Sequence, residues 1–274
     1  QLLPSASAYI GADITAGVVA SGMITGPKPA LLVDIGTNGE IVLVDDDKMT
    51  GCSTAAGPAF EGSGLAWGSR AVVNAISHVH IDPKSHEMRI ERLTEKIQTR
   101  GKRAVPGICG TAYIDFLAEA YRAQWIGPSG RFNADIDAEV FTSKHHGNAI
   151  SLAKGGQKLD PEEQPYIAEG DLATLLQAKA AIAAGIIILL QRSGYQAADI
   201  GQLYLAGGFG MAMNVSNAIA MGLLPGFNET QIKLVGNTAL AGSALCCLDV
   251  GFHDEIDRIA RNIDVVELNT DPMF

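Results

Sequence analysis

The sequence contains only four cysteines, Cys52, Cys109, Cys246 and Cys247, and none of them forms a Cys-x-x-Cys pair. Zinc ribbons and ferredoxin-type clusters need such closely spaced pairs, so neither kind of site is expected within this chain. Small reduced cysteines in apolar surroundings are typical of cytoplasmic proteins, which is the localisation we expect. The adjacent Cys246 and Cys247 could be redox-active, but both lie in an apolar helical pattern.

Basic residues are also in the minority, with 20 Lys and Arg against 30 Asp and Glu and a formal net charge of −10. This balance argues against nucleic acid and against a polybasic membrane contact. The longest nearly apolar run, residues 180–190, is too short for the about 20 residues that cross a membrane, so we expect a core helix. No signal peptide or initiator methionine is visible at Gln1, and we expect a piece of a longer protein.

Apolar residues make up 47% of the 274 residues, which is enough for a sizeable core. Hydrophobic periodicity and turn signals predict strands at 30–35, 40–44, 49–53, 78–81, 88–90, 149–154, 203–206 and 264–268. They predict helices at 11–22, 69–76, 111–125, 171–192, 214–221, 238–248 and 256–263. The glycines of 11–22 suggest close packing against another element, and Asp171 is the expected N-cap of the long helix. Strands mixed with helices in this way indicate an α/β protein.

A short hairpin is expected between the strands 30–35 and 40–44, because it contains an Asn-Gly turn signal. A tight turn with glycines points successive amides the same way, so Gly36, Thr37 and Asn38 are candidates for binding a phosphate group. Asp34, at the end of a buried strand, is placed to hold Mg²⁺ directly or through water. A hairpin whose Asp and Thr only satisfy the turn explains the pattern equally well.

Two further segments combine glycines with polar residues. Gly110 and Thr111 open the predicted helix 111–125, where free amides suit a phosphate or a ribose, although a loop followed by a Thr-capped helix is common. Glu61 lies among small apolar residues, where its carboxylate could orient a water molecule or a metal ion. More often such an acid is a helix-cap partner or is solvated.

The buried strand 203–206 is followed directly by glycine-rich sequence. Glycines at a strand end allow a flat ring such as adenine to lie on the backbone. A sharp strand-to-helix turn is the commoner meaning of this pattern on its own. The residues in question are Gly207, Gly208, Phe209 and Gly210.

The order of these segments resembles the second half of the ATPase fold shared by acetate kinase, sugar kinases, heat-shock chaperones and actin. Residues 30–44 are similar to its second phosphate loop, 203–210 to its adenosine motif, and 11–22 and 236–244 to its two connecting helices. The resemblance implies an actin-like (ribonuclease H-like) α/β fold, with a mixed sheet and helices on both sides. It also implies that residues 1–26 end a truncated first lobe and that residues 27–274 form the complete second lobe.

The longer motifs resemble one branch in particular, the reductive activators of corrinoid proteins. They are residues 31–40, 52–62, 107–110 and 236–240. Members of that branch use ATP hydrolysis to help return cob(II)alamin on a partner protein to cob(I)alamin. For this chain the resemblance implies ATP and Mg²⁺ as cofactors, a corrinoid protein of a methyltransferase system as partner, and dimerisation.

The chain departs from the family pattern in two respects. It has no Asp-x-Gly-Thr hairpin before residue 11 and no cysteines suited to an iron–sulfur cluster. We expect both in a preceding portion, with the cluster supplying the electron. By resemblance to actin, Asp13 is expected to position the attacking water, although an Asp at a helix start is usually a cap. Glu61 is the second candidate catalytic residue.

Two other functions remain open from the sequence. One is a small-molecule kinase of the same superfamily, although no sugar or carboxylate motif is recognisable. The other is a module that docks the corrinoid partner without hydrolysing ATP in this form. Activators of hydroxyacyl-CoA dehydratases share the fold, but Cys52 and Cys109 do not lie in the motifs that hold their bridging cluster.

Overall fold

The structure is a computed structural model that describes residues 2–46, 48–93, 105–136, 138–152, 160–208 and 210–272. The chain forms two compact units. Unit 1 comprises Gln1–Ala56, Ala180–Val215 and Gly222–Phe274, and unit 2 comprises Gly57–Lys179 and Ser216–Met221. The predicted boundary between residues 26 and 27 stays a prediction about a longer chain.

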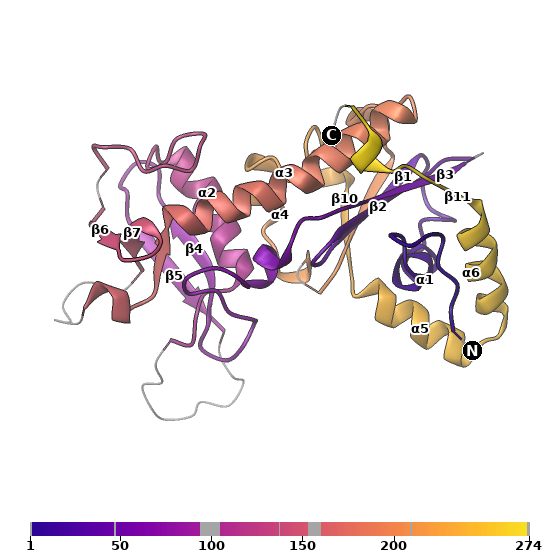
Figure 1. Cartoon of the computed structure of the whole chain (residues 1–274), viewed down its shortest axis with the longest axis horizontal. Coiled ribbons are helices and arrows are strands. Elements are labelled where there is room, and N and C mark those ends of the chain that lie inside the picture. Colours follow the sequence, from indigo (N-terminus) through magenta and orange to yellow (C-terminus); the bar gives the residue numbers. More distant parts are fainter. Residues whose placement is uncertain are drawn as a thin grey trace. The chain divides into compact units, whose positions relative to one another are not determined.

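A mixed six-stranded sheet is the centre of unit 1, in the order β10-β9-β1-β2-β3-β11 (Figure 1). β1, β2 and β3 form an antiparallel meander, whereas β9 and β10 extend it in parallel from β1, and β11 pairs in parallel with β3. The strands are β1 (Ala30–Ile35), β2 (Gly39–Val44), β3 (Met49–Thr54), β9 (Gln202–Ala206), β10 (Ile232–Gly236) and β11 (Ile263–Val265).

Helices cover both faces of this sheet. On one face, α1 (Ala12–Ser21) and α6 (Gly251–Asn262) pack on alternate residues of β1, β2 and β9. On the other face, the C-terminal half of α3 (Glu169–Arg192) approaches so closely that a Cβ on Gly185 would lie 2.5 Å from Thr54. The sheet is therefore buried on both sides, as the apolar run of β1 predicts.

α1 lies against α5 (Thr238–Leu248), and small residues bring the two helices together. A Cβ on Gly242 would come within 2.5 Å of the Ala16 carbonyl oxygen, and one on Gly17 within 2.9 Å of the Thr238 hydroxyl oxygen. The close packing expected from the glycines of 11–22 is confirmed. Because a methyl group at either position needs room that is not there, glycine is required at this crossing.

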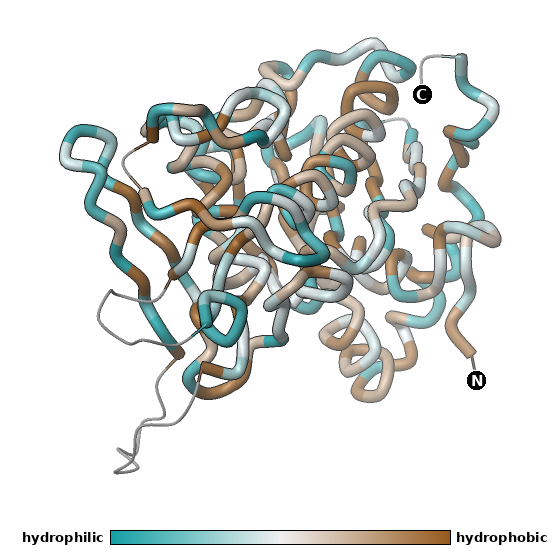
Figure 2. Tube along the Cα trace, turned by 60° about the vertical axis from the view of Figure 1, so that its left-hand side comes forward, coloured by the Kyte–Doolittle hydropathy of each residue, from teal (hydrophilic) through white to brown (hydrophobic). Residues whose placement is uncertain are grey.

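Unit 2 contains the helix α2 (Gly110–Arg122), the N-terminal part of α3 and, among its described residues, two small antiparallel sheets. α2 packs on the β4–β5 hairpin, and Tyr166 of the β6-β7-β8 sheet contacts Trp67 and Phe141 edge-on. Figure 2 shows brown, hydrophobic residues concentrated on the helices and strands and teal residues mainly on the connecting turns. The elements are β4 (Ile76–Ile81), β5 (Met88–Arg92), α2 (Gly110–Arg122), β6 (Val140–Ser143), β7 (Gly147–Ser151), β8 (Tyr166–Ala168) and α4 (Val215–Ala220), with the short 3₁₀ helices η1 (Pro58–Glu61) and η2 (Pro161–Glu163).

The helix predicted over 69–76 is wrong. The backbone of this segment bonds instead to residues 107–109: Ser69 N–H donates to the Ile108 carbonyl and Ile76 N–H to the Gly107 carbonyl. Asn74 adopts a left-handed conformation (φ 71°), which a helix interior does not tolerate. β4 begins directly at Ile76.

Smaller differences concern element ends and three strands that the sequence did not reveal. α3 begins at Glu169, so Asp171 lies inside its first turn, where its carboxylate accepts from the amides of Ala66 and Ala168. The predicted strand 149–154 ends at Ser151 as β7, and Lys154 lies outside the described residues. β6, β8 and β10 were not predicted, because a short and mostly exposed strand, three apolar residues and a half-buried edge strand give weak patterns.

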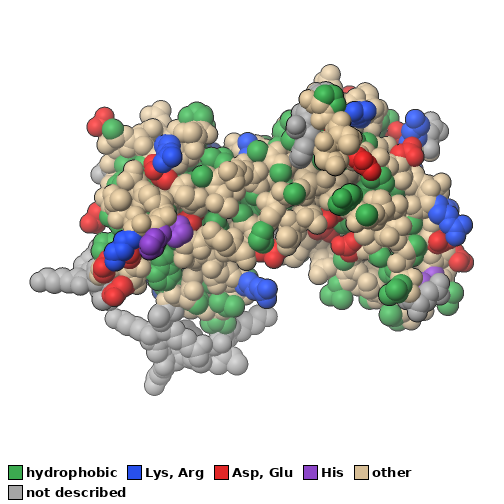
Figure 3. Space-filling model, viewed as in Figure 1, with side chains coloured by type: hydrophobic (Ala, Val, Ile, Leu, Met, Phe, Trp, Pro, Cys, Tyr) green, Lys and Arg blue, Asp and Glu red, His purple; other side chains and the backbone are tan. Residues whose placement is uncertain are grey.

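α3 is long and apolar enough to cross a membrane by length and composition alone, but half of its most apolar window is buried inside the protein. Its fully buried residues recur at three- and four-residue spacing: Leu172, Leu175, Ile182, Ile186 and Leu189. That spacing is typical of a helix with one face in a protein core. The space-filling view in Figure 3 shows acidic and basic side chains scattered over the visible face, without a continuous basic patch.

Candidate functional site

The β1–β2 hairpin forms the turn that the sequence offered as a candidate for phosphate binding. Asp34 and Glu40 face each other in the ladder, and Thr37 and Asn38 are exposed at the turn. The Gly36 amide donates to the Asn38 carbonyl at 3.0 Å, so this amide closes the turn. The hairpin also borders a hollow of about 360 Å³ lined by Asn38, Ser53, Thr54 and Ala55 together with Tyr9 and residues 265–269.

The glycines after β9 lie against this hairpin, because β9 pairs in parallel with β1 and places Ala206 beside Asp34. Gly207 has a φ of +98°, and a Cβ there would lie 2.6 Å from the Ile35 carbonyl oxygen and 3.1 Å from Asp34 Oδ1. Gly208, in contrast, faces open space, with no atom within 4 Å of its Cβ position. Gly210 is buried at the start of η4 (Gly210–Ala212), and Phe209 lies outside the described residues.

The carboxylates of Asp13, Asp34 and Glu40 form an electrostatic cluster. Burial and the neighbouring Asp13 raise the pKa of Asp34 to about 6. Burial, Asp13 and Asp34 raise the pKa of Glu40 to about 7, against a smaller opposing effect of a hydrogen bond from the Asn38 side chain. Such shifts mean that the negative charges repel one another and are poorly solvated, a situation typical of functional sites.

Asp13 belongs to this cluster through α1, whose first turn it occupies. Its side chain is exposed, and Asp13 Oδ1 accepts a hydrogen bond from the Ile14 amide at 3.0 Å. This contact satisfies an amide at the helix start, the ordinary structural role of such an Asp. The proximity to Asp34 goes beyond that role, and the water-positioning function of Asp13 stays a prediction.

The residues present fit a Mg²⁺–nucleotide complex in their chemistry. Two partly buried carboxylates with raised pKa values favour a cation, which would offset the repulsion between them. Among the described residues, no three His, Cys, Asp or Glu side chains are arranged to hold a metal ion by themselves. Mg²⁺ usually takes one or two carboxylates together with substrate phosphates and water, so Asp34 matches this mode. Asp34 as metal ligand stays a prediction.

The other predicted residues lie in unit 2. Glu61 is exposed at the end of η1, and its catalytic role stays a prediction. Gly110 is the first residue of α2, which has no side-chain cap. The Thr111 hydroxyl is buried and donates to the Ser77 carbonyl at 2.6 Å, so it joins α2 to β4 rather than facing a ligand. Its backbone amide stays a candidate for phosphate or ribose.

Unit 2 also contains a buried polar network that was not predicted from the sequence. By helical spacing, Asp115 and Glu119 lie opposite the apolar face of 111–125 and would be expected in solvent, yet they are only 2% and 8% exposed. Their partners are two histidines of β4 and an asparagine of α4. The contacts are His78–Asp115 at 2.8 Å, His80–Glu119 at 2.7 Å, and Asn217 with Asp115 at 2.7 Å and with Glu119 at 3.3 Å. The His-x-His alternation on β4 was the signal available in the sequence.

Replacing Gly207 with Ala is expected to destabilise unit 1 by about 2–3 kcal/mol, because a side chain at positive φ is strained and its Cβ would collide with the Ile35 carbonyl. Gly208→Ala is the matched control. Its Cβ meets nothing within 4 Å, so its free energy of unfolding should stay within about 0.5 kcal/mol of the parent. Urea denaturation of the three proteins measures both values, and equal effects of the two substitutions would contradict the packing described here.

Replacing Glu40 with Gln is expected to raise stability at pH 8 but not at pH 4. Since the folded pKa is raised to about 7 from an ordinary 4.5, the protonated acid favours the folded state at low pH. That contribution is lost as the pH rises through about 7. The glutamine side chain cannot ionise, so the variant does not lose stability as the pH rises. Its free energy of unfolding at pH 8 should therefore exceed that of the parent by on the order of 1–2 kcal/mol, after allowance for partial exposure of the side chain.

Denaturation of the parent and the Glu40→Gln protein between pH 4 and pH 8 measures the effect. Glu229→Gln, at an exposed position of the same unit, is the control and should show no such pH-dependent gain. A gain for Glu40→Gln that is independent of pH would rule out the electrostatic explanation.

The geometry and the sheet topology define the class of domain: a mixed α/β sheet of the actin-like type, as predicted, with a hairpin and a glycine-bearing strand end side by side. Residues 28–274 match the family model described as the C-terminal domain of RACo, the ASKHA domain. The chain belongs to this family.

Similar proteins extend this result. The chain is 32% identical, over 99% of its length and 45% of the relative's, to the corrinoid activation enzyme RamQ of Eubacterium limosum. It is 27% identical, over 95% of its length and 46% of the relative's, to the [Co(II) methylated amine-specific corrinoid protein] reductase of Methanosarcina barkeri. A solved structure titled reductive activator for corrinoid, iron-sulfur protein superimposes with a TM-score of 0.85 at 34% identity, covering 99% of this chain and 42% of the other. The chain thus spans less than half the length of these relatives.

Proposed function

We propose that this chain is the ATPase part of a reductive activator, which uses ATP hydrolysis to help reduce cob(II)alamin to cob(I)alamin on a corrinoid protein. The observation that supports this most strongly is the meeting of the β1–β2 hairpin, Asp34 and Gly207 in unit 1. The names of the relatives support a corrinoid protein as the partner. A methyltransferase system as its context, dimerisation and a cytoplasmic location are part of the same proposal.

In this proposal each of the candidate residues of unit 1 has a separate role in binding or hydrolysing Mg·ATP. Asp34 holds Mg²⁺, and the exposed turn at Thr37 and Asn38 binds the phosphate groups by donating hydrogen bonds to them. Gly208 offers an open stretch of backbone on which a flat base can lie. Asp13 orients a water molecule near the carboxylate cluster. When bound, Mg·ATP would supply the terminal phosphoanhydride bond whose hydrolysis drives a conformational change.

The cysteines of this chain do not suit the electron-transfer step. All four are free thiols, and Cys52, Cys109 and Cys246 are buried. Burial raises the pKa of Cys52 to about 12 and also raises that of Cys109, which opposes the thiolate that an iron–sulfur cluster needs. We therefore assign the electron donor to an iron–sulfur cluster in a portion outside these 274 residues.

Titration calorimetry with Mg·ATP, followed by ATP turnover assays, tests the proposal. Micromolar binding, together with turnover that a corrinoid protein accelerates and a panel of sugars and carboxylic acids does not, is the expected result. Acceleration by a sugar or an acid would indicate a small-molecule kinase instead. Binding to a corrinoid protein without any binding of Mg·ATP would indicate a docking module.

A further inference from the structure

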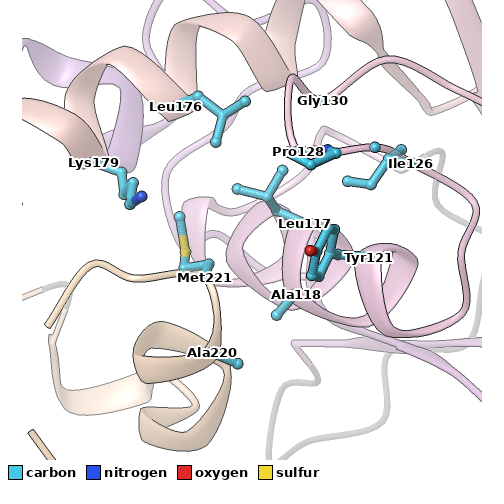
Figure 4. A pocket seen from close by; sticks show the side chains of 11 residues that line it. Leu117, Ala118, Tyr121, Ile126, Pro128, Gly130, Leu176, Lys179, Ala220 and Met221 are labelled. Carbon is cyan, nitrogen blue, oxygen red and sulfur yellow. The ribbon is translucent and has the colours of Figure 1, made fainter. Parts of the chain in front are cut away.

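A second pocket lies entirely within unit 2, and none of its lining residues is among those assigned to the nucleotide (Figure 4). It has a volume of about 240 Å³ and lies between the C-terminal part of α2, the turn that follows it, α3 and the end of α4. Its walls are mostly aliphatic. The main contributors are Leu117, Tyr121, Ile126, Leu176, Lys179 and Met221.

One wall of the pocket is formed by a tight turn that backbone hydrogen bonds hold in place. The Gly130 amide donates to the Gly127 carbonyl at 2.9 Å, and the Gly127 amide donates to the Arg131 carbonyl at 2.9 Å. Gly130 has a φ of +73°, and a Cβ there would lie 2.9 Å from Leu176 Cδ1, so the backbone itself closes the pocket at this point. Buried Leu117 and Ile126, which are 4% and 3% exposed, complete a rigid apolar floor.

Two polar groups border this apolar space. Figure 4 shows the Lys179 ammonium on one side and the Tyr121 phenol on the other, with Leu117 and Met221 between them. In the part of the chain that the structure describes, neither side chain makes a hydrogen bond or an ion pair. Lys179 is half-buried, and an ammonium group beside aliphatic walls gains from an anion, because that anion replaces favourable interactions with water.

We propose that this pocket binds a small organic monoanion: a carboxylate attached through a short chain to a single ring or an apolar group of similar size. The volume sets the size, since a cavity of about 150 Å³ in a protein core accepts benzene, and the larger space here leaves room for a short acidic chain. Lys179 binds the carboxylate, Tyr121 borders the ring, and the aliphatic walls exclude water from it. None of the lining residues is part of the proposed ATPase machinery, so the inference does not depend on that function.

Binding of 3-phenylpropionate and of its neutral counterpart 3-phenylpropanol to the whole chain tests the proposal, measured by ligand-observed NMR titration. The expected result is saturable 1:1 binding of the acid with a Kd of about 1 mM, the range that a ligand of this size reaches. The alcohol should bind about tenfold more weakly, because it lacks the charge-assisted contact.

Three variants locate the binding. Lys179→Met should weaken binding of the acid about tenfold and leave binding of the alcohol unchanged. Lys84→Met removes the same charge from an exposed position of unit 2, outside the pocket, and should change neither. Leu176→Trp fills the pocket from α3 and should abolish binding of both ligands, with melting temperatures confirming that each variant is folded.

Absence of saturable binding of either ligand at about 10 mM would overturn the proposal. So would binding of the acid that Lys179→Met and Leu176→Trp leave intact, since the acid would then occupy another place. If Lys179→Met fails to fold, Lys179→Gln keeps a polar side chain and the same loss of charge, and it is judged by the same outcomes.

Discussion

Replacing Asp34 with Asn is expected to reduce Mg·ATP binding by this chain at least about a hundredfold while making the folded protein more stable at pH 8. The loss follows from removal of the carboxylate that we propose as the Mg²⁺ ligand at the end of β1. The gain in stability follows from the cluster, because burial and Asp13 raise the pKa of Asp34 to about 6 and make its charge unfavourable at pH 8. An Asp whose charge stabilised the folded state would lose stability on substitution rather than gain it.

Asp46→Asn is the matched control for this experiment. Asp46 lies in the turn after β2, its side chain is 90% exposed, and its carboxylate forms an ion pair with Lys28 at 3.8 Å. Calorimetry with Mg·ATP and thermal unfolding at pH 8, with and without Mg²⁺, measure both effects for the two variants. Unchanged Mg·ATP affinity for Asp34→Asn would remove Asp34 from the site, and equal effects of the two variants would show that only net charge matters.

The sequence predicted the framework of unit 1 well because its signals are local. The apolar run of β1, the Asn-Gly turn and the glycines after β9 each depend on few neighbours, and all three lie where they were expected. The match of the whole order to a known family added the fold class, which the periodicities alone left at α/β.

Features that depend on distant partners were not predictable in the same way. Asp115 and Glu119 look like a solvated helix face, because nothing near them in the sequence shows that Asn217, about a hundred residues later, will satisfy them. The segment 69–76 has apolar residues at helical spacing, but its backbone finds partners at 107–109 instead. The raised pKa values of Asp34 and Glu40 come mainly from burial and secondly from Asp13, and both causes exist only in the folded protein.

Replacing Asn217 with Ala is expected to destabilise unit 2 by about 3 kcal/mol, because Asn217 contacts two buried acidic side chains and one exposed arginine at once. Its amide nitrogen donates to Asp115 and Glu119, and its carbonyl oxygen accepts from the Arg122 guanidinium at 2.6 Å. Alanine leaves all three without this partner, and an uncompensated buried charge is among the most costly defects in a protein core. Asn148→Ala, at an exposed position of the same unit with a single 3.4 Å side-chain bond, should cost less than about 0.5 kcal/mol.

The pH dependence of this defect distinguishes lost hydrogen bonds from a simple cavity. Burial already raises the pKa of Asp115, and the hydrogen bond from Asn217 opposes that rise. Without Asn217 the folded pKa rises further, so the stability that protonation of Asp115 provides at low pH is lost more steeply as the pH increases. The penalty of Asn217→Ala should therefore be smaller at pH 5 than at pH 8, as measured by urea denaturation at both values. A penalty that is the same at both pH values would mean that the side chain only fills space between α2 and α4.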